Sequence, residues 1–244
     1  MNSPLPGREP PEPTRLGDVA WLEPFPDLLL AGLPDGAPGP EARVEARESI
    51  SLAFVTALQL LPPRQRAVLI LRDVLGFRAS EVAEVLDCTE ESVTSALKRA
   101  RAALRDRSPA GPEPEAPPLP GSAAELELIE RFTRAFEAGD VGDIVALLTE
   151  DVWLTMPPLA LEYHGRELAA RFLAAVRHGR RYRVVATRAN GQPAFGVYVR
   201  DPHASIAHAN GLLVLTLAGG RISVMTNFPA SVFPTFGLPR TLPD

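Results

Sequence analysis

The chain has little cysteine and no long apolar run, and these shortages exclude several classes of protein. Its 244 residues include one cysteine, Cys88, which excludes an intrachain disulfide and a multi-cysteine metal site. No apolar run approaches the length of a bilayer span, and residues 1–15 lack the apolar segment of a secretory signal. No Gly-rich phosphate loop or cluster of metal ligands is present. We therefore expect a cytoplasmic protein without cofactor, metal or membrane partner.

The acidic residues are concentrated outside the segments that have a periodic apolar pattern. The net charge is −5, yet residues 41–107 carry 11 Arg and Lys against 10 Asp and Glu, and residues 122–244 carry 12 of each kind. The excess acid lies in residues 1–40 and 108–121, which are rich in proline. The near-neutral middle segment is thus compatible with nucleic-acid binding, but its charge alone does not predict it.

The same division predicts four segments. Residues 1–40 form a Pro/Gly-rich linker whose WLEPFP stretch is apolar enough that we expect it to dock on a surface. Residues 41–107 show helical periodicity, with Pro62-Pro63 ending one helix and starting the next. Residues 108–121 are an acidic Pro-rich linker, expected to be extended. Residues 122–244 form a second domain.

Residues 79–100 predict two short helices on either side of a break at residues 87–89. Small Ala83 lets the helices approach, and Thr89 suits the N-cap of the second helix. The apolar residues expected in their shared core are Val82, Val85, Leu86, Val93 and Leu97. A helix pair of this kind is how a DNA-reading helix is mounted. The sequence therefore predicts an all-α helix-turn-helix domain.

This segment, LPPRQRAVLILRDVLGFRASEVAEVLD, resembles region 4 of bacterial sigma-70-type factors of the extracytoplasmic-function class. The resemblance implies that it reads the −35 promoter element and that promoter DNA and RNA polymerase are its partners. In that class, region 2 precedes a linker similar to WLEPFPD, binds the core polymerase and melts the −10 element. Because this sequence starts at the linker, we expect region 2 to be missing, and the contacts with DNA and polymerase to be weak or lost.

The second helix has an unusual first turn for a DNA-reading helix. Glu90 and Glu91 favour the helix dipole but repel phosphate, and the turn has no arginine or lysine for guanine. Hydroxyls and later cations can still reach phosphates. The expected DNA contacts are Arg78, Thr89, Ser92, Ser95, Lys98, Arg99 and Arg101. The alternative is that the unit packs on a neighbour or a partner and does not bind DNA.

Residues 122–244 predict an α+β domain. Two helices, a strand entered at Asp151 and a third helix precede a strand-rich region, in which Asn190-Gly191 is a hairpin turn. With phrases such as EDVWLTMPP and ANGQPAF, the pattern resembles the SnoaL-like polyketide cyclases over residues 123–236. Their cone-shaped fold is shared with nuclear transport factor 2 and ketosteroid isomerase. The resemblance implies a curved antiparallel sheet that encloses a conical cavity with the helices.

Alternation along the strands suggests which side chains face that cavity. Glu162 and His164 share one strand face and could form an acid–base pair, whereas the alternative for EYHGRE is a solvated hairpin tip. His208 suits a cavity position or core packing equally. The full candidate set is Trp153, Met156, Glu162, Tyr163, His164, Tyr182, Tyr198, His208 and Asn227.

Asn227 lies where many cyclases of this fold carry a catalytic carboxylate. An amide cannot take a proton at neutral pH, so this position favours binding over that mechanism. The following tail is rich in Phe and Pro, and we expect it to wrap the domain and plug part of the cavity or its interface.

Two functional hypotheses remain. The first, which we favour, is a sigma-factor-like DNA-binding transcription protein with a SnoaL-like regulatory domain. The second is a cofactor-independent enzyme for cyclisation, isomerisation or epoxide opening, in which Glu162, His164, Tyr182 or His208 moves protons and the helix-turn-helix is a scaffold. Both allow a small hydrophobic ligand in the C-terminal cavity and self-association through the C-terminal sheet.

Overall fold

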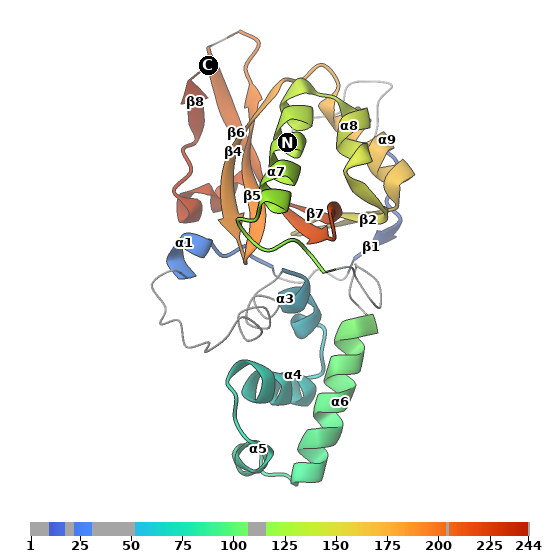
Figure 1. Ribbon diagram of the computed structural model, residues 1–244, viewed down its shortest axis with the longest axis vertical. Helices are drawn as coiled ribbons and strands as arrows, with labels where there is room; N and C mark the ends of the chain where they lie inside the picture. Colours follow the sequence, from blue (N-terminus) through green and yellow to red (C-terminus); the bar gives the residue numbers. More distant parts are fainter. Residues whose placement is uncertain (1–9, 18–21, 31–51, 107–115, 204, 244) are drawn as a thin grey trace. The chain divides into compact units, whose positions relative to one another are not determined.

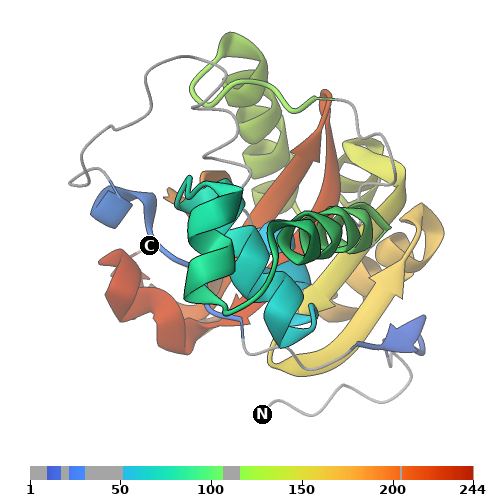
Figure 2. The ribbon, with the colours of Figure 1, turned by 90° about the horizontal axis from the view of Figure 1, so that it is seen from below.

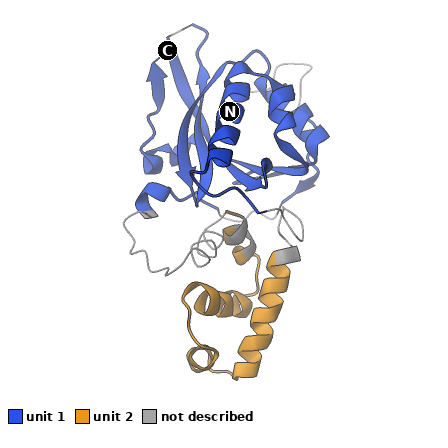
Figure 3. Ribbon diagram, in the orientation of Figure 1, with its two compact units in different colours: residues 1–32, 114–244 blue, residues 33–113 orange. Residues whose placement is uncertain are grey.

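The computed structural model describes residues 10–17, 22–30, 52–106, 116–203 and 205–243. The chain divides into two compact units, a helical unit (residues 33–113) and an α/β unit (residues 1–32 with 114–244) (Figure 3). Trp21, the start of the predicted helical run near residue 41 and residues 107–115 of the predicted linker lie outside the described residues. No helix in the described ranges has the length and apolar character needed to cross a membrane.

The helical unit has the predicted helix-turn-helix. Its described elements are α3 (Leu52–Gln59), α4 (Pro63–Leu69), the π-helical η1 (Ile70–Val74), α5 (Ala79–Val85) and α6 (Glu90–Asp106). Pro63 occupies the first turn of α4, where a missing N–H costs nothing. The second helix of the pair, α6, has 17 residues and is not short as expected.

The core of this unit follows the apolar pattern at all but one expected position. Its buried residues are Leu61, Val68, Leu69, Val82, Ala83, Val93, Ala96, Leu97 and Ala100. Leu86 packs against them from a partly buried position. The prediction that Val85 lies in the core is wrong, because this residue is 63% exposed. It follows Ala83 by two positions, which at about 100° per residue places it on nearly the opposite side of α5.

The α/β unit has one curved sheet, and the three α-helices within residues 123–177 pack on one of its faces (Figure 1). Its helices are α1 (Asp27–Leu30), α7 (Ala123–Ala138), α8 (Val141–Ala146), α9 (Arg166–Arg177) and the 3-10 helix η2 (Ala230–Phe236). Its strands are β1 (Arg15–Leu16), β2 (Leu148–Met156), β3 (Leu159–His164), β4 (Tyr182–Ala189), β5 (Gln192–Arg200), β6 (Ile206–Ala218), β7 (Arg221–Pro229) and β8 (Thr241–Pro243). The strand order is β1-β3-β2-β7-β6-β5-β4, with β8 on β6. The β2–β7 pair is parallel and the other pairs are antiparallel.

Local signals explain where these elements begin and end. The Ser122 hydroxyl accepts a hydrogen bond from the Glu125 N–H (3.3 Å) and caps α7, which ends at Gly139 with φ +77°. Asn190 and Gly191 have φ of +54° and +73°. Two successive positive φ values suit the two-residue turn between twisted antiparallel strands, so β4 and β5 form the predicted hairpin.

The N-terminal residues are part of the α/β unit. Strand β1 pairs with β3 and extends the sheet beyond it (Figure 2), and just before β1 the Thr14 N–H donates to the Glu162 carbonyl (2.8 Å). Farther along, Phe25 and Asn190 exchange two hydrogen bonds, of 2.8 and 2.9 Å, at the β4–β5 turn. The sequence predicts a linker over residues 1–40, whereas its described part docks on this unit, as expected for the WLEPFP stretch.

The C-terminal tail covers the face of β5 that is turned away from the helices. Phe195 and Val197 belong to the core beneath the helices, so Tyr198 points the opposite way. There its ring packs on Phe233 of η2 (5.3 Å), and its hydroxyl donates to the Pro239 carbonyl (2.9 Å). The tail wraps the domain as predicted, but it does not plug the cavity described below, because it lies on the other face of the sheet.

Candidate functional site

Helix α6 presents a polar face with hydroxyls and two cations. The Ser92 N–H donates to the Thr89 hydroxyl (3.2 Å), so Thr89 caps the helix as predicted. Ser95, Lys98 and Arg99 are exposed on the following turns. Because each can donate to a phosphate oxygen, this face has the chemistry of a backbone-contacting surface.

Two other expected DNA contacts have roles within the unit. Arg101 donates from Nε and Nη2 to the two carboxylate oxygens of Asp73 (2.9 and 2.7 Å), which ties α6 to η1. Arg78 is exposed where α5 begins, and its backbone N–H donates to Glu81 (2.6 Å). Arg101 is therefore less free to reach DNA than Lys98 or Arg99.

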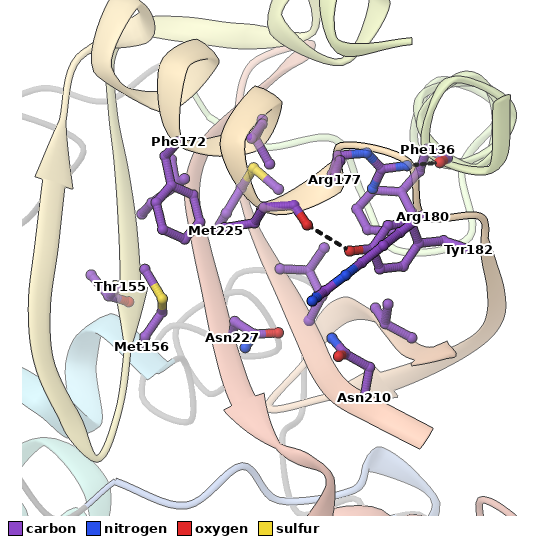
Figure 4. A pocket seen from close by; sticks show the side chains of 15 residues that line it. Phe136, Thr155, Met156, Phe172, Arg177, Arg180, Tyr182, Asn210, Met225 and Asn227 are labelled. Carbon is purple, nitrogen blue, oxygen red and sulfur yellow. Dashed lines mark hydrogen bonds between the residues drawn. The ribbon is translucent and has the colours of Figure 1, made fainter. Parts of the chain in front are cut away.

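The α/β unit contains a cavity of about 200 Å³ between the sheet and helices α7 and α9 (Figure 4). Most of its wall is apolar, and the polar part consists of one hydroxyl, one phenol, two amides and two guanidinium groups. The lining residues are Phe136, Leu154, Thr155, Met156, Phe172, Leu173, Val176, Arg177, Arg180, Tyr182, Val197, Asn210, Leu213, Met225 and Asn227. Among the residues predicted from sequence, Met156, Tyr182 and Asn227 are in this set.

The expected acid–base pair lies outside this cavity. The carboxylate of Glu162 forms an ion pair with Arg15, and His164 stacks on Trp153 with 4.3 Å between ring centroids. The Arg15 guanidinium also lies 4.5 Å from the centroid of Trp153. Tyr163, which lies between these two residues on β3, points into the core. Because side chains alternate along a strand, Glu162 and His164 face away from the core. The alternative of a solvated hairpin tip is also wrong, because β3 pairs with β1 and β2.

The other predicted cavity residues have different positions. Tyr163 packs in the core on Phe172 (4.7 Å), and Tyr198 packs beneath the tail. Burial raises the pKa of both phenols above the ordinary value. His208 is exposed at the β6–β8 pairing, with Nε2 3.7 Å from Asp201 Oδ2, so it neither lines the cavity nor packs in the core.

Arg177, Arg180 and Asn210 line the cavity but were not predicted. Arg177 is 6% exposed, and its guanidinium donates to the Phe136 carbonyl and lies over the rings of Phe136 (3.9 Å) and Tyr182 (4.4 Å). Burial lowers the pKa of Arg177 below the ordinary arginine value. An arginine at the end of an amphipathic helix usually points to solvent, so no sequence signal marked Arg177 as a buried residue.

The cavity has no group suited to general acid–base chemistry at neutral pH. None of its lining residues is an aspartate, glutamate or histidine. The Tyr182 hydroxyl donates to the Val176 carbonyl (3.2 Å) and is thus engaged in the wall. The arrangement is suited to holding a small molecule in place.

Comparisons with known proteins match both units. Residues 51–104 match the model of sigma-70 region 4, and residues 129–225 match that of the SnoaL-like domain. The extracytoplasmic-function RNA polymerase sigma factor SigG of Mycobacterium tuberculosis CDC 1551 is 38% identical over 232 residues, which are 92% of this chain and 60% of SigG. SigJ of strain H37Rv is 31% identical over 163 residues, 63% of this chain and 47% of SigJ.

A solved structure resembles the chain over most of its length. The crystal structure of the Mycobacterium tuberculosis sigma factor SigJ has a TM-score of 0.62 at 23% identity, with 91% of this chain and 77% of SigJ covered. This likeness concerns the fold. The chain spans about 60% of the length of SigG, the curated relative with the higher identity.

Proposed function

Because the chain joins a sigma-70 region 4 to a SnoaL-like domain, we propose that it is a transcription protein that contacts promoter DNA and RNA polymerase through its helical unit. The α/β unit is then its regulatory domain, and the cytoplasm is its compartment. The observation that carries the proposal is the 38% identity to a sigma factor over 92% of this chain, across both units.

The exposed face of α6 supports the DNA contact. Ser95, Lys98 and Arg99 offer phosphate-binding groups on a helix whose partner α5 is packed against it. Glu90 and Glu91 in the first turn can accept hydrogen bonds from cytosine N4 in the major groove. Because few cations are present on this face, the contact is weak and sensitive to salt.

An exposed apolar group supports the contact with a protein partner. Val74 at the end of η1, and Leu75 and Phe77 between η1 and α5, are 48%, 58% and 38% exposed. Neighbouring large apolar side chains on a surface are typical of protein interaction sites. We assign this group to the polymerase side of the complex.

The cavity favours a regulatory role of the α/β unit over the enzymatic alternative. With no carboxylate or imidazole in its wall, the cavity supports ligand binding more than proton transfer. A small ligand with an apolar body is therefore its expected occupant. Self-association through the outer sheet face would compete with the C-terminal tail, which packs on Tyr198 there.

The test measures binding of the full chain to promoter fragments by fluorescence anisotropy over a range of salt concentrations. The double variant Lys98→Ala/Arg99→Ala should bind more weakly and reduce the slope of log affinity against log salt by about two. The control Arg131→Ala/Arg134→Ala removes the same charge from α7 and should leave the slope unchanged. Absence of binding to promoter fragments and to core polymerase at low salt would refute the proposal.

A further inference from the structure

The charged side chains that line the cavity are all positive. Arg177 and Arg180 bring two positive charges to its wall, and no lining residue is acidic. The remaining wall is mainly aliphatic, aromatic and thioether groups, which hold few compensating dipoles. In such surroundings an attraction between opposite charges is stronger than in water, so the site favours an anion.

Arg177 is a buried cation without an anionic partner among the described residues. Its described partners are the Phe136 carbonyl and two aromatic rings, and its Nε has no hydrogen-bond partner. Buried charges in proteins are normally paired. The lowered pKa of this guanidinium has the same cause, since burial without an opposite charge disfavours the protonated form.

The cavity mouth gathers donors from three separate segments. Arg180 follows α9, Asn210 lies on β6 and Asn227 on β7, and Figure 4 shows the Arg180 side chain extended across the cavity toward both amides. A guanidinium presents a planar fork that matches a carboxylate, and an amide N–H adds a further donor. The side-chain amide of Asn227 is neutral and therefore does not repel an anion.

We propose that the cavity binds a small organic carboxylate, with its carboxylate held by Arg180 and the amides of Asn210 and Asn227. This inference rests on the proposed regulatory role of the α/β unit and names the class of its ligand. The apolar body of the ligand lies against Phe172 and Met225. The volume of about 200 Å³ is below the range of about 300–1,000 Å³ for sites of drug-sized ligands, which limits the body to one ring or a short branched chain.

The experiment is isothermal titration calorimetry of the full chain, without DNA or polymerase. The probes are benzoate, phenylacetate and isovalerate, each compared with its own neutral amide. We expect at least one carboxylate to bind, with an affinity about tenfold or more above that of its amide. Arg180→Gln should lower the affinity for that carboxylate about tenfold, and Asn227→Asp should abolish binding.

Arg171→Gln is the matched control, because it removes an exposed arginine from α9 that does not line the cavity. Its affinity for the carboxylate should stay within about twofold of the unmodified chain. Arg180 is chosen over Arg177 because it is exposed, so its substitution should leave the fold intact.

The proposal is overturned if no carboxylate binds, if the amides bind as tightly as the carboxylates, or if Arg180→Gln and Arg171→Gln behave alike. These outcomes concern the cavity alone. A chain that binds carboxylates but neither promoter DNA nor core polymerase would instead refute the transcription proposal, so the two failures can be told apart.

Discussion

Arg101 and Asp73 form a bidentate ion pair that joins α6 to η1, with N–O distances of 2.9 and 2.7 Å. The pair lies on the surface, with 54% of the arginine side chain and 26% of the aspartate side chain exposed. It links η1 to the helix that carries Lys98 and Arg99. Arg101 therefore has a structural role in the helical unit, and its contact with DNA stays a prediction.

Replacing Arg101 with alanine should lower the free energy of unfolding of the helical unit by about 0.5–1 kcal/mol, because a surface ion pair is screened by water. Urea denaturation followed by circular dichroism measures the change. Asp73→Asn should have a similar effect, since it removes the same charge interaction. If Arg101→Ala left stability unchanged and reduced DNA affinity as much as Lys98→Ala, the arginine would have to be returned to the DNA contacts.

Asn190 has two separate roles that substitution can distinguish. Its positive φ shapes the hairpin, and its side-chain oxygen accepts a hydrogen bond from Phe25. Asn190→Gly should keep the turn but weaken docking of the N-terminal segment, whereas Asn190→Ala should also lower stability by about 1 kcal/mol. Hydrogen exchange at the Phe25 amide reports docking, and thermal unfolding reports stability. Equal effects of both variants on unfolding would contradict this separation.

Glu125 is a buried carboxylate that depends on Arg188. It is 2% exposed, and Arg188 donates to both of its oxygens (3.1 and 3.3 Å) and to Asp27 (3.3 Å). Arg188→Met should cost about 3 kcal/mol of stability, because it leaves a buried charge without its main partner. Arg181→Met removes an exposed arginine just before β4 and serves as the control. Chemical denaturation measures the free energy of unfolding of both variants. A loss of stability in Arg188→Met no larger than that in Arg181→Met would contradict the importance of the Glu125–Arg188 pair.

Tyr163 and Tyr198 should make stability depend on pH at the alkaline end. Burial raises the pKa of both phenols in the folded state, so the neutral forms stabilise the fold. This contribution is fully present below the unfolded value of about 10 and is lost as pH rises through the folded pKa. Phenolate absorbance and denaturation at several pH values measure it. Tyr163→Phe and Tyr198→Phe should each weaken the alkaline loss, and an unchanged pH profile in both would contradict the assignment.

Features set by a few neighbouring residues could be predicted from the sequence. Pro63 at a helix start, Thr89 as a cap and the Asn190-Gly191 turn each depend on local backbone preferences. The two folds could also be predicted, because their apolar periodicities are clear and their resemblances are specific.

The candidate cavity could be predicted only in part. Alternation correctly put Glu162 and His164 on one side of β3, but it does not say which side meets the helices. That choice depends on packing of Tyr163 against Phe172, from a different element. The docking of residues 14–17 on β3 is likewise a long-range pairing without a local signal.

Lys98 has a consequence for chemical labelling, since it is the one lysine in the sequence and is exposed on α6. Apart from the α-amino group, an amine-selective reagent therefore has a single target, on the face assigned to DNA. Isotope-labelled reductive methylation keeps the positive charge at this position and gives one spectroscopic probe there. Helix α6 can thus be observed in the intact chain without mutation.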